Sequence, residues 1–364
     1  MAEKLKIGVI GGGGIANSKH FPAIKAVDMA QIMATCDIIE ERAVKAAKEY
    51  GAEGCKVYTD YHDLLKLDLD AVFVLTPNRW HSEITCAALK SGKHVMCEKP
   101  MAHTYAAACE MLDAAKQSGK LLTIGYQGRY RANSQYLKQL CEDGELGEIY
   151  LGRANAIRRR AVPTWGVFLD EYAQGGGPLI DIGTHALDLT LWMMNNYQPR
   201  YCVGTTYHKL NKDTNQGNAW GAWDPEKFTV EDSAFGFVVM ENGATAQVNA
   251  AWALNTLDVE EATTTLSGTL AGADMHAEHG GLAINGIKNN RQYTLTPNLK
   301  AGGAAFFEGK TADRPENIEH RIFCEAILGR GGLTVLPEQA ACVTRILEGI
   351  YTSAHTGEPY YFDK

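Results

Sequence analysis

Short apolar segments alternate with helix-like segments through about residue 125, and this alternation restricts the possible folds more than any other feature. The strand candidates are residues 5–11, 31–37, 55–59, 70–76, 93–99 and 120–126. The segments between most of them have helical patterns, and several end on glycine, as helix C-termini often do. Strands that alternate with helices form right-handed βαβ units. The pattern therefore predicts an α/β domain with a parallel sheet covered on both faces.

The turn after the first strand is rich in glycine, since residues 11–16 read GGGGIA. Gly11, Gly13 and Ala16 satisfy the dinucleotide-binding pattern G-x-G-x-x-A. The first glycine permits a tight turn, the second lets backbone amides approach a pyrophosphate, and the alanine lets the helix pack close to the sheet. Such a pattern alone would also fit an ordinary loop, but here a strand precedes it and a helix follows. Predicted cofactor contacts in this turn are Gly11, Gly13, Gly14, Ile15 and Ala16.

Asp37 ends the second predicted strand, 21 residues after Ala16. A carboxylate at this position can accept hydrogen bonds from the adenosine ribose hydroxyls and would repel the 2′-phosphate of NADP. Ile38 and Ile39 follow, and the next basic residue is Arg42. These residues favour NAD over NADP as the cofactor. The alternative is that Asp37 only caps the next helix, which would leave the cofactor preference open.

Length and composition bound the rest of the interpretation. A chain of 364 residues favours two domains, which we place at 1–126 for NAD binding and 127–364 for substrate binding and oligomerisation. The last helices are free in this scheme to pack back on the first domain. The net charge of −8 and the pI of about 5.8 give no basic footprint for nucleic acid. The one notable basic cluster, residues 158–160, is either a solvated face or an anion or substrate contact.

The chain also carries no signal for a membrane or a secretory route. It has no run of about 18 apolar residues, so no transmembrane helix is expected. The N-terminus lacks the long apolar stretch of a secretory signal. The nine cysteines are scattered without a C-x-x-C pair. This usage favours buried reduced thiols in a cytoplasmic protein over disulfides or a zinc cluster.

Beyond residue 148 the pattern changes to strands without regular helices between them. Residues 231–252 predict a hairpin with its turn at Asn242-Gly243, and residues 261–278 continue in the same β-rich manner. Two later helical patterns, around 315–328 and 337–355, are expected to close the chain. The second domain is therefore predicted to be α+β with an open sheet.

Ligands of open α/β sheets bind at the carboxyl ends of the strands, so polar residues there are candidate site residues. Strand four ends in residues 76–78, strand five in residues 97–100 and strand six in residues 125–127. Lys99 is the most notable, because Pro100 biases it toward extended geometry and so aims its side chain. The alternative for Lys99 is a surface lysine in a turn.

The segment GGGPLIDIGTHALDLTLWMM, residues 175–194, reads as a buried helix that carries three polar side chains on one face: Asp181, His185 and Asp188. Pro178 suits its first turn. Burying such groups without partners costs several kcal/mol, on the order of what one core side chain contributes. Three readings remain open for Asp181 and His185: a satisfied structural pair, a metal site, or a catalytic pair. Asp188, one turn deeper, is expected to be structural.

The metal reading lacks an evident third ligand, because the later histidines have no fixed relation to this helix. These histidines are His276, His279 and His320. No metal is therefore expected.

Four motifs together resemble the glucose–fructose oxidoreductase / inositol dehydrogenase family (Gfo/Idh/MocA). They are the glycine turn, TPNRWH at 76–81, CEKPMA at 97–102 and GGGPLIDIGTHALD at 175–188. They occur in order from residue 4 to about 200. The resemblance implies a dinucleotide-binding domain followed by a domain with an open, mostly antiparallel sheet. It also implies a homo-oligomer (a dimer or tetramer) joined through the faces of such sheets.

In this family the residues that match Lys99, Asp181 and His185 surround the reacting hydroxyl. By that match His185 is the expected general acid/base, Lys99 binds the same oxygen, and Asp181 orients a neighbouring hydroxyl. Whether Lys99 or His185 takes the proton stays open, because their titrations would be coupled. The resemblance adds cofactor contacts at Thr76, Pro77, Asn78, His81, Glu98, Lys99 and Gln127. It adds substrate contacts at Lys99, Tyr126, Arg129, Arg158, Trp165, Asp181 and His185, with Arg160 a further candidate.

The expected reaction is NAD-dependent oxidation of a ring secondary hydroxyl of a sugar or glycoside, with carbon 3 as one candidate position. An inositol or a nucleotide sugar is the alternative substrate. For Trp165, stacking on a sugar ring and plugging the core are equally open. A catalytically silent NAD-sensing protein is a further alternative, as is an enzyme that recycles one bound NAD in place. No nucleic-acid or membrane partner is expected.

Overall fold

The computed structural model describes residues 4–276, 281–299 and 314–362. Packing divides the chain into two units. The first contains the described residues of Met1–Tyr130 and Ala304–Ala341, and the second those of Arg131–Gly303 and Cys342–Lys364. His279 and positions 277–278 of the predicted β-rich stretch lie outside the described residues.

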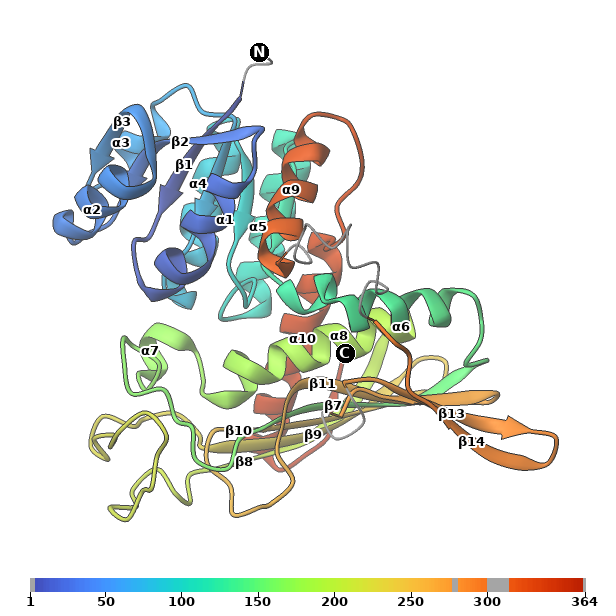
Figure 1. Ribbon diagram of the computed structural model, residues 1–364. Helices are drawn as coiled ribbons and strands as arrows, with labels where there is room; N and C mark the ends of the chain where they lie inside the picture. The colour runs from blue at the N-terminus through green and yellow to red at the C-terminus, as the bar shows by residue number, and fades with distance from the viewer. Residues whose placement is uncertain (1–3, 277–280, 300–313, 363–364) are drawn as a thin grey trace. The chain divides into compact units, whose positions relative to one another are not determined.

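The first unit is built on a six-stranded sheet in the order β3-β2-β1-β4-β5-β6, in which every neighbouring pair is parallel (Figure 1). This confirms the predicted parallel sheet, and the order is the one typical of dinucleotide-binding domains. All six predicted strands are present, and β3 begins earlier than expected. The strands are β1 (Leu5–Ile10), β2 (Ala30–Cys36), β3 (Gly51–Tyr58), β4 (Ala71–Val74), β5 (His94–Cys97) and β6 (Leu122–Ile124).

Helices connect these strands where the sequence predicts them. Helix α5 shows how individual residues set where a helix begins and ends. The Thr104 side chain caps its start by accepting the Ala107 N–H at 3.2 Å, and Gly119 ends it with φ +64°. The helices are α1 (Phe21–Ala26), α2 (Glu40–Tyr50), α3 (Tyr61–Leu65), α4 (His81–Lys90), α5 (Tyr105–Ser118) and α9 (Pro315–Ile327). Three single turns complete the set: η1 (Ala16–His20), η2 (Asn78–Trp80) and η3 (Gln127–Tyr130).

The core of the first unit lies around β1 and β4. All four residues of β4 are buried, which explains its unbroken apolar sequence. Phe323 of α9 joins Ile7 and Phe73 in the same buried cluster. The helix predicted at 315–328 is therefore present and contributes to this core from the far end of the chain.

The second unit is built on nine strands in the order β14-β13-β12-β11-β7-β10-β9-β8-β15. Only the β7–β10 pair is parallel, so the sheet is mostly antiparallel as predicted. The strands are β7 (Ile149–Ile157), β8 (Pro199–Tyr207), β9 (Ser233–Met240), β10 (Thr245–Ala251), β11 (Glu260–Gly268), β12 (Ala271–Asp274), β13 (Ala283–Lys288), β14 (Arg291–Leu295) and β15 (Tyr360–Tyr361).

The predicted hairpin is formed by β9 and β10. Its turn places Gly243 at φ +85°, a backbone conformation that favours glycine, and the Met240 N–H donates to the Ala244 carbonyl at 2.8 Å. Buried and partly exposed residues alternate along β10, which is typical of a sheet packed on one face.

The helices of the second unit include α6 (Ala132–Glu142), α7 (Glu171–Gln174), α8 (Thr184–Met194) and the turn η4 (Leu179–Gly183). The division between the units passes through α10 (Pro337–Thr356). Helix α8 packs on β7 and β11 and against α6 (Figure 1). A Cβ at Gly152 of β7 would lie 2.6 Å from the Thr190 side chain, so α8 approaches the sheet closely there. Among the described helices, none has the length and apolarity that a membrane span requires.

Candidate active site

The glycine turn has the geometry that a bound pyrophosphate needs. Gly11 has φ +103°, and a Cβ on it would lie 2.4 Å from the Leu75 carbonyl oxygen, so only glycine fits. A Cβ on Gly13 or Gly14 would meet nothing within 4 Å, so the space over the helix start is open. Ala16 is fully buried against the sheet. The residues of this turn therefore fit a dinucleotide phosphate group.

Asp37 lies next to this turn and braces it. One carboxylate oxygen accepts the Gly12 N–H at 2.7 Å, and the other accepts the Ile39 N–H at 2.8 Å. Ile39 is the N-cap of α2, so Asp37 also stabilises the approach to that helix. Asp37 is not itself the cap of α2, because the N-cap residue is Ile39 and α2 has no side-chain cap. Since each carboxylate oxygen has two lone pairs, these hydrogen bonds leave the predicted ribose contact possible.

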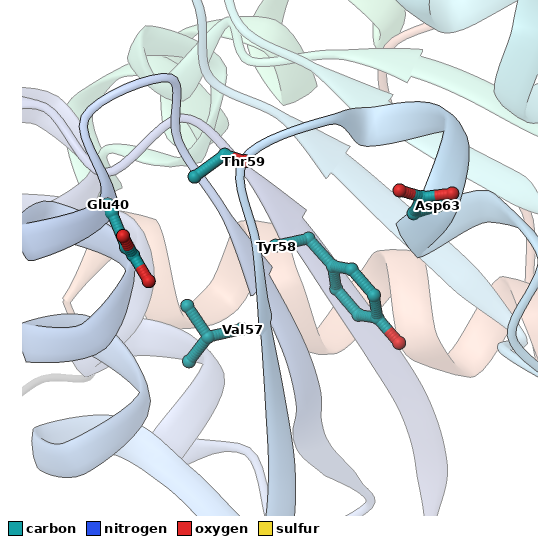
Figure 2. Close-up of a pocket in the computed structure, with 5 residues that line it drawn as sticks. All are labelled: Glu40, Val57, Tyr58, Thr59 and Asp63. Atoms are coloured by element: carbon teal, nitrogen blue, oxygen red, sulfur yellow. The ribbon is translucent and has the colours of Figure 1, made fainter.

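A concave site of about 210 Å³ opens where β3 ends and α2 begins (Figure 2). Figure 2 shows Glu40 and Asp63 on its two sides, with the end of β3 between them. None of the predicted site residues lines it; the lining residues are Glu40, Val57, Tyr58, Thr59 and Asp63. The two carboxylates make this corner of the sheet acidic. Burial raises the pKa of the neighbouring Cys36 thiol to about 12, with further contributions from Asp37 and Asp63.

The loop after β4 contains a buried hydroxyl without a partner. The Thr76 Oγ1 atom is enclosed but makes no hydrogen bond. A buried polar atom left unpaired costs about 1–3 kcal/mol, so this position calls for a ligand group or water. Thr76 is a predicted cofactor contact, and this orphaned atom is a second feature that fits a bound dinucleotide.

His81 connects two of the predicted loops. It is fully buried, with Nδ1 2.8 Å from the Pro100 carbonyl oxygen and Nε2 2.8 Å from the Thr76 carbonyl oxygen. Both of its ring nitrogens are thus occupied by backbone, so His81 holds the Thr76 loop against the Lys99 loop. Its predicted contact with the cofactor stays a prediction.

Lys99 is half-buried and held at its backbone by the preceding residue. The Lys99 N–H donates to Glu98 Oε2 at 2.9 Å. The other carboxylate oxygen of Glu98 lies 3.0 Å from Lys19 Nζ and 2.8 Å from His20 Nε2. Glu98 is buried, so its carboxylate positions the Lys99 loop.

Glu98 belongs to a buried cluster that the sequence did not reveal. Lys19 lies between Glu98 and Glu319, with Nζ 3.1 Å from the Glu319 carboxylate. His320 Nε2 lies 3.0 Å from His20 Nδ1. All five side chains are at most 6% exposed. Four of the five come from segments that the site motifs do not include.

Burial and charge act against each other in this cluster. Burial alone would lower the pKa of Lys19, but Glu319 and Glu98 hold it above its ordinary value. Burial would raise the pKa of Glu98, yet Lys19 and His20 hold it well below the usual range. Burial raises the pKa of Glu319 to about 7 and lowers that of His20 to about 4. Around neutral pH Lys19 and Glu98 are therefore charged and His20 is neutral.

The residues after β6 differ in their exposure. Tyr126 is 1% exposed and Arg129 is fully buried. The Arg129 guanidinium donates to the Thr334 carbonyl at 2.9 Å and to Gln339 Oε1 at 2.6 Å, so it ties η3 to a distant segment. Gln127 is partly exposed. The substrate contacts expected of Tyr126 and Arg129 stay predictions, and the structure gives Arg129 a structural role.

Asp181 and His185 are the exceptions in an otherwise buried helix. From Gly176 to Met193 every residue is buried apart from these two, which are partly exposed. The Trp252 indole N–H donates to the Asp181 carboxylate at 3.1 Å. Asp188, by contrast, is 1% exposed. Asp181 and His185, four positions apart, are therefore both accessible in part, as a catalytic pair would have to be.

The three glycines before this helix are each constrained. Gly175 has φ +82°. A Cβ on Gly176 would lie 2.2 Å from the Tyr351 hydroxyl, and one on Gly177 would lie 2.4 Å from the Glu231 carbonyl oxygen. The loop thus passes too close to its neighbours for any side chain.

Glu231 holds the start of the helix and was missed by the sequence analysis. Its buried carboxylate accepts the Gly177 N–H at 2.8 Å, the Leu179 N–H at 3.1 Å and the Tyr351 hydroxyl at 2.8 Å. It thereby satisfies amides at the helix start that have no intrahelical acceptor. The sequence around Glu231 shows only an acidic residue just before a predicted strand, and such residues are too common to indicate a role.

We expect Glu231 to make stability depend on pH. Burial raises its pKa from 4.5 to about 7, although its hydrogen bonds act in the opposite direction. Between these values the folded state keeps a proton that the unfolded chain releases, so the free energy of unfolding falls as pH rises through this window. The contribution is on the order of 3 kcal/mol. Urea unfolding of Glu231→Gln from pH 4.5 to pH 8 should show a flatter profile than the natural protein. Equal slopes in the two proteins would contradict the assignment.

Other predicted substrate residues lie on the second unit. Arg158 forms a bidentate pair with Glu261 and stacks on Trp220, with the guanidinium 5.1 Å from the ring centre. Trp165 is 50% exposed, so it does not plug the core. Arg160 donates to Asn255 Oδ1 at 2.7 Å.

Within the described residues, one group of three side chains has a spacing that fits a metal ion. Asp258, Glu260 and His276 place their candidate ligand atoms within 4.8 Å of one another. Neither Asp181 nor His185 belongs to it. The metal reading of the Asp181–His185 pair therefore gains no third ligand from the described residues.

Comparison with known proteins agrees with both units. Residues 5–126 match the family model described as an oxidoreductase family with an NAD-binding Rossmann fold, and residues 134–273 match the model of the GFO/IDH/MocA C-terminal domain. The chain belongs to the Gfo/Idh/MocA family of oxidoreductases. The family resemblance drawn from the four motifs is thus confirmed, as is the Rossmann fold of the first unit.

Two curated relatives in this family differ in how much of the chain they match. D-glucoside 3-dehydrogenase of Escherichia coli (strain K12) is 32% identical over 358 residues, covering 98% of this chain and 97% of its own. Inositol 2-dehydrogenase of Salmonella typhimurium is 31% identical over 193 residues, 52% of this chain and 55% of its own. Both relatives are dehydrogenases.

Solved structures with the same fold cover the whole chain. An oxidoreductase domain protein from Kribbella flavida aligns with a TM-score of 0.85 at 21% identity, covering 100% of both chains. Levoglucosan dehydrogenase, in complex with NADH and levoglucosan, aligns with a TM-score of 0.82 at 22% identity over 100% of both chains. At these identities the structures support the fold alone.

Proposed function

We propose that this Gfo/Idh/MocA member is an NAD-dependent dehydrogenase that oxidises a ring secondary hydroxyl of a neutral sugar or glycoside. The observation that carries the proposal is the pair Asp181 and His185, the two partly exposed residues between Gly176 and Met193, where every other residue is buried. The relative that matches nearly the whole chain is named for a glucoside and for carbon 3. Carbon 3 is therefore our first candidate for the reacting position.

In this proposal each residue of the site has one task. His185 takes the proton of the reacting hydroxyl at a ring nitrogen as general base. Lys99 donates a hydrogen bond to the same oxygen from its ammonium group and stabilises the developing negative charge. Asp181 accepts a hydrogen bond from a neighbouring hydroxyl, with its carboxylate held in place by Trp252. Bound NAD would supply the hydride acceptor for the alcohol carbon.

The glycine turn, Asp37 and Thr76 are the residues that would hold the cofactor. Gly13 and Gly14 leave room for the pyrophosphate, and the unpartnered Thr76 hydroxyl offers a polar contact. Glu98, His81 and Lys99 are also expected to contact the cofactor, and Glu98 and His81 in addition position their loops. The remaining expected contacts are Ile15, Pro77, Asn78 and Gln127.

We propose NAD over NADP because this end of the sheet is acidic. Asp37 lies beside the glycine turn, and Glu40 and Asp63 line the adjacent concave site. A 2′-phosphate placed there would meet like charges. Arg42, the nearest basic residue in sequence, is exposed at the start of α2.

Asp37→Ala is expected to weaken NAD binding by about tenfold or more and to reduce the discrimination against NADP. The change removes both the ribose acceptor and the brace on the Gly12 amide. Calorimetric titration with each cofactor measures the two affinities, with Asp68→Ala, an exposed carboxylate of the same unit, as the control. An unchanged ratio of the NAD and NADP affinities would contradict the proposed selectivity.

A spectrophotometric screen tests the proposed activity. Purified protein with NAD, and separately with NADP, is given free sugars, methyl glycosides, inositols and nucleotide sugars, and reduced nicotinamide is followed by absorbance. Turnover of sugars or glycosides with NAD is the expected result. Turnover of only inositols or nucleotide sugars would contradict the proposed substrate class and assign that class of compound instead. Silence with tightly copurified NAD would point to recycling of one bound cofactor, and silence with weak reversible NAD binding to a sensing protein.

Two further parts of the proposal concern the protein's state. We propose a homo-oligomer joined through the sheet face opposite α10, where Val203, Tyr207 and Phe237 are 37–39% exposed. Light scattering measures the mass of the assembly in solution.

We also propose a cytoplasmic location, because all nine cysteines, which lie in the described part of the chain, are free thiols.

A further inference from the structure

Two tryptophans of the second unit stand side by side with much of their surface exposed. Trp165 is 50% exposed and Trp220 is 43% exposed, and their ring centres lie 5.0 Å apart in an edge-to-face arrangement. Tryptophan is seldom this exposed without a function, because its large ring gains more than most side chains from burial. The pair therefore calls for a ligand surface.

A continuous row of aromatic rings leads from this pair to the proposed catalytic helix. Trp165 contacts Phe168 with ring centres 6.0 Å apart, and Phe168 contacts Trp252 at 6.4 Å. Trp252 is fully buried and donates its indole N–H to Asp181. Along the row Trp252 is fully buried, Phe168 is partly exposed, and Trp165 and Trp220 are the most exposed rings. The row is longer than a single six-membered ring would cover.

The outer end of the row is carried by a loop with a defined structure. Residues 208–232, between β8 and β9, contain no regular element (Figure 1). Hydrogen bonds of two side chains nevertheless fix the path of the loop. Asn218 exchanges hydrogen bonds with both backbone groups of Val162, at 2.8 and 3.0 Å. The Thr164 hydroxyl donates to the Trp220 carbonyl at 2.8 Å. These bonds join the Trp220 loop to the Trp165 loop, so the two rings are held in register before any ligand binds.

The charge around the pair is balanced. Arg158 stacks on the Trp220 ring, and its guanidinium is paired in bidentate fashion with Glu261. A guanidinium engaged this way has little left to offer to a phosphate. The Arg158 charge is therefore balanced by Glu261 and offers no free cation to a diphosphate-linked group, while Arg159, the next residue, is exposed.

We propose that Trp165 and Trp220 form a second subsite that binds the neutral ring attached to the reacting sugar, so that the preferred substrates are aryl glycosides or disaccharides. The inference rests on the proposed function and extends it to the substrate class. The reacting pyranose lies at Asp181, and the attached ring packs on the exposed aromatic faces. Aromatic packing adds to the affinity beyond the area that it buries.

Equilibrium binding tests the subsite separately from turnover. Protein loaded with NADH, which cannot oxidise the sugar, is titrated by calorimetry with methyl β-glucoside and with 4-nitrophenyl β-glucoside. The aryl glucoside is expected to bind about tenfold more tightly. Trp220→Ala should remove this difference and leave the methyl glucoside affinity within about twofold of its original value. Trp220→Phe, which keeps an aromatic face, should retain most of the preference.

Three results would overturn the subsite. The first is equal affinity for the two glucosides in the natural protein. The second is a preference that survives Trp220→Ala, and the third is tighter binding of uridine diphosphate glucose than of the aryl glucoside. Loss of the proposed function looks different, because it would appear as an absence of NAD reduction with every sugar while the binding preference is still present.

Discussion

His185→Ala lowers the turnover of the sugar substrate by about 10²–10⁴-fold if His185 is the general base, the range that a positioned base usually contributes. NAD affinity should change little, because the cofactor residues belong to the first unit and His185 to the second. The substitution is expected to be mild for the fold, since His185 is partly exposed. Steady-state kinetics measures the turnover number, and calorimetry measures the NAD affinity.

His208→Ala is the matched control, because this histidine is exposed in the same unit and outside the proposed site. It should retain normal turnover. Near-normal turnover of His185→Ala would remove His185 from the acid/base role and leave Lys99 as the remaining candidate. A parallel loss of NAD affinity would instead indicate a defect of folding.

Lys19→Met is expected to lower the free energy of unfolding by about 3–5 kcal/mol, the usual cost of leaving a buried charge without its partner. Lys19 is 6% exposed and is the cation shared by Glu98 and Glu319. Without it, two buried carboxylates face each other in a medium that solvates them poorly. Thermal or urea unfolding followed by circular dichroism measures the change.

Two variants make this test specific. Lys66→Met breaks an ion pair of similar length, 2.7 Å to Asp63, but on the surface, and should cost no more than about 1 kcal/mol. The double variant Lys19→Met/Glu319→Gln replaces the carboxyl group opposite Glu98 with a neutral amide and should recover part of the loss. A Lys19→Met protein as stable as Lys66→Met would contradict the buried cluster.

The first unit could be predicted from sequence almost element by element. Its strands are buried on both faces and read as short apolar runs, and its turns carry glycines whose role is local. Gly11 illustrates this, since a positive φ and a 2.4 Å approach to a carbonyl are requirements that the residue type itself reveals. The hairpin of the second unit could be predicted for the same reason, because its turn pattern is local, whereas the mostly antiparallel sheet as a whole was implied by the family resemblance.

The supporting residues of the site could not be predicted, because they act over long sequence separations. His320 meets His20 across 300 positions, and Tyr351 meets Glu231 across 120. Periodicity reports which face of a helix is buried and not what that face contacts. Glu319 and His320 therefore read as ordinary helix residues until the fold places them beside Lys19.

The exposure of the candidate site residues could not be predicted from their positions in the sequence either. Arg129 follows the sixth predicted strand, and Trp165 precedes the predicted helix of residues 175–194. Both were expected to contact the substrate, and their positions in the sequence did not indicate that their exposures differ. The structure buries Arg129 completely and leaves Trp165 half exposed. The end of a strand locates a side chain near the site edge, whereas the packing of later segments, such as Thr334 on Arg129, decides whether a ligand can reach it.

The central claim is that a ring carbon of a sugar gives up its hydrogen to bound NAD, and isotope transfer tests it most directly. Methyl β-glucoside carrying deuterium at carbon 3, and a second sample carrying it at carbon 2, are each incubated with the protein and NAD, and the reduced nicotinamide is analysed by mass spectrometry. The account predicts reduced nicotinamide with one deuterium from the carbon 3 sample and none from the carbon 2 sample. Deuterium from carbon 2 alone would move the reaction to another ring position. Reduced nicotinamide without deuterium from any labelled ring carbon would contradict the account.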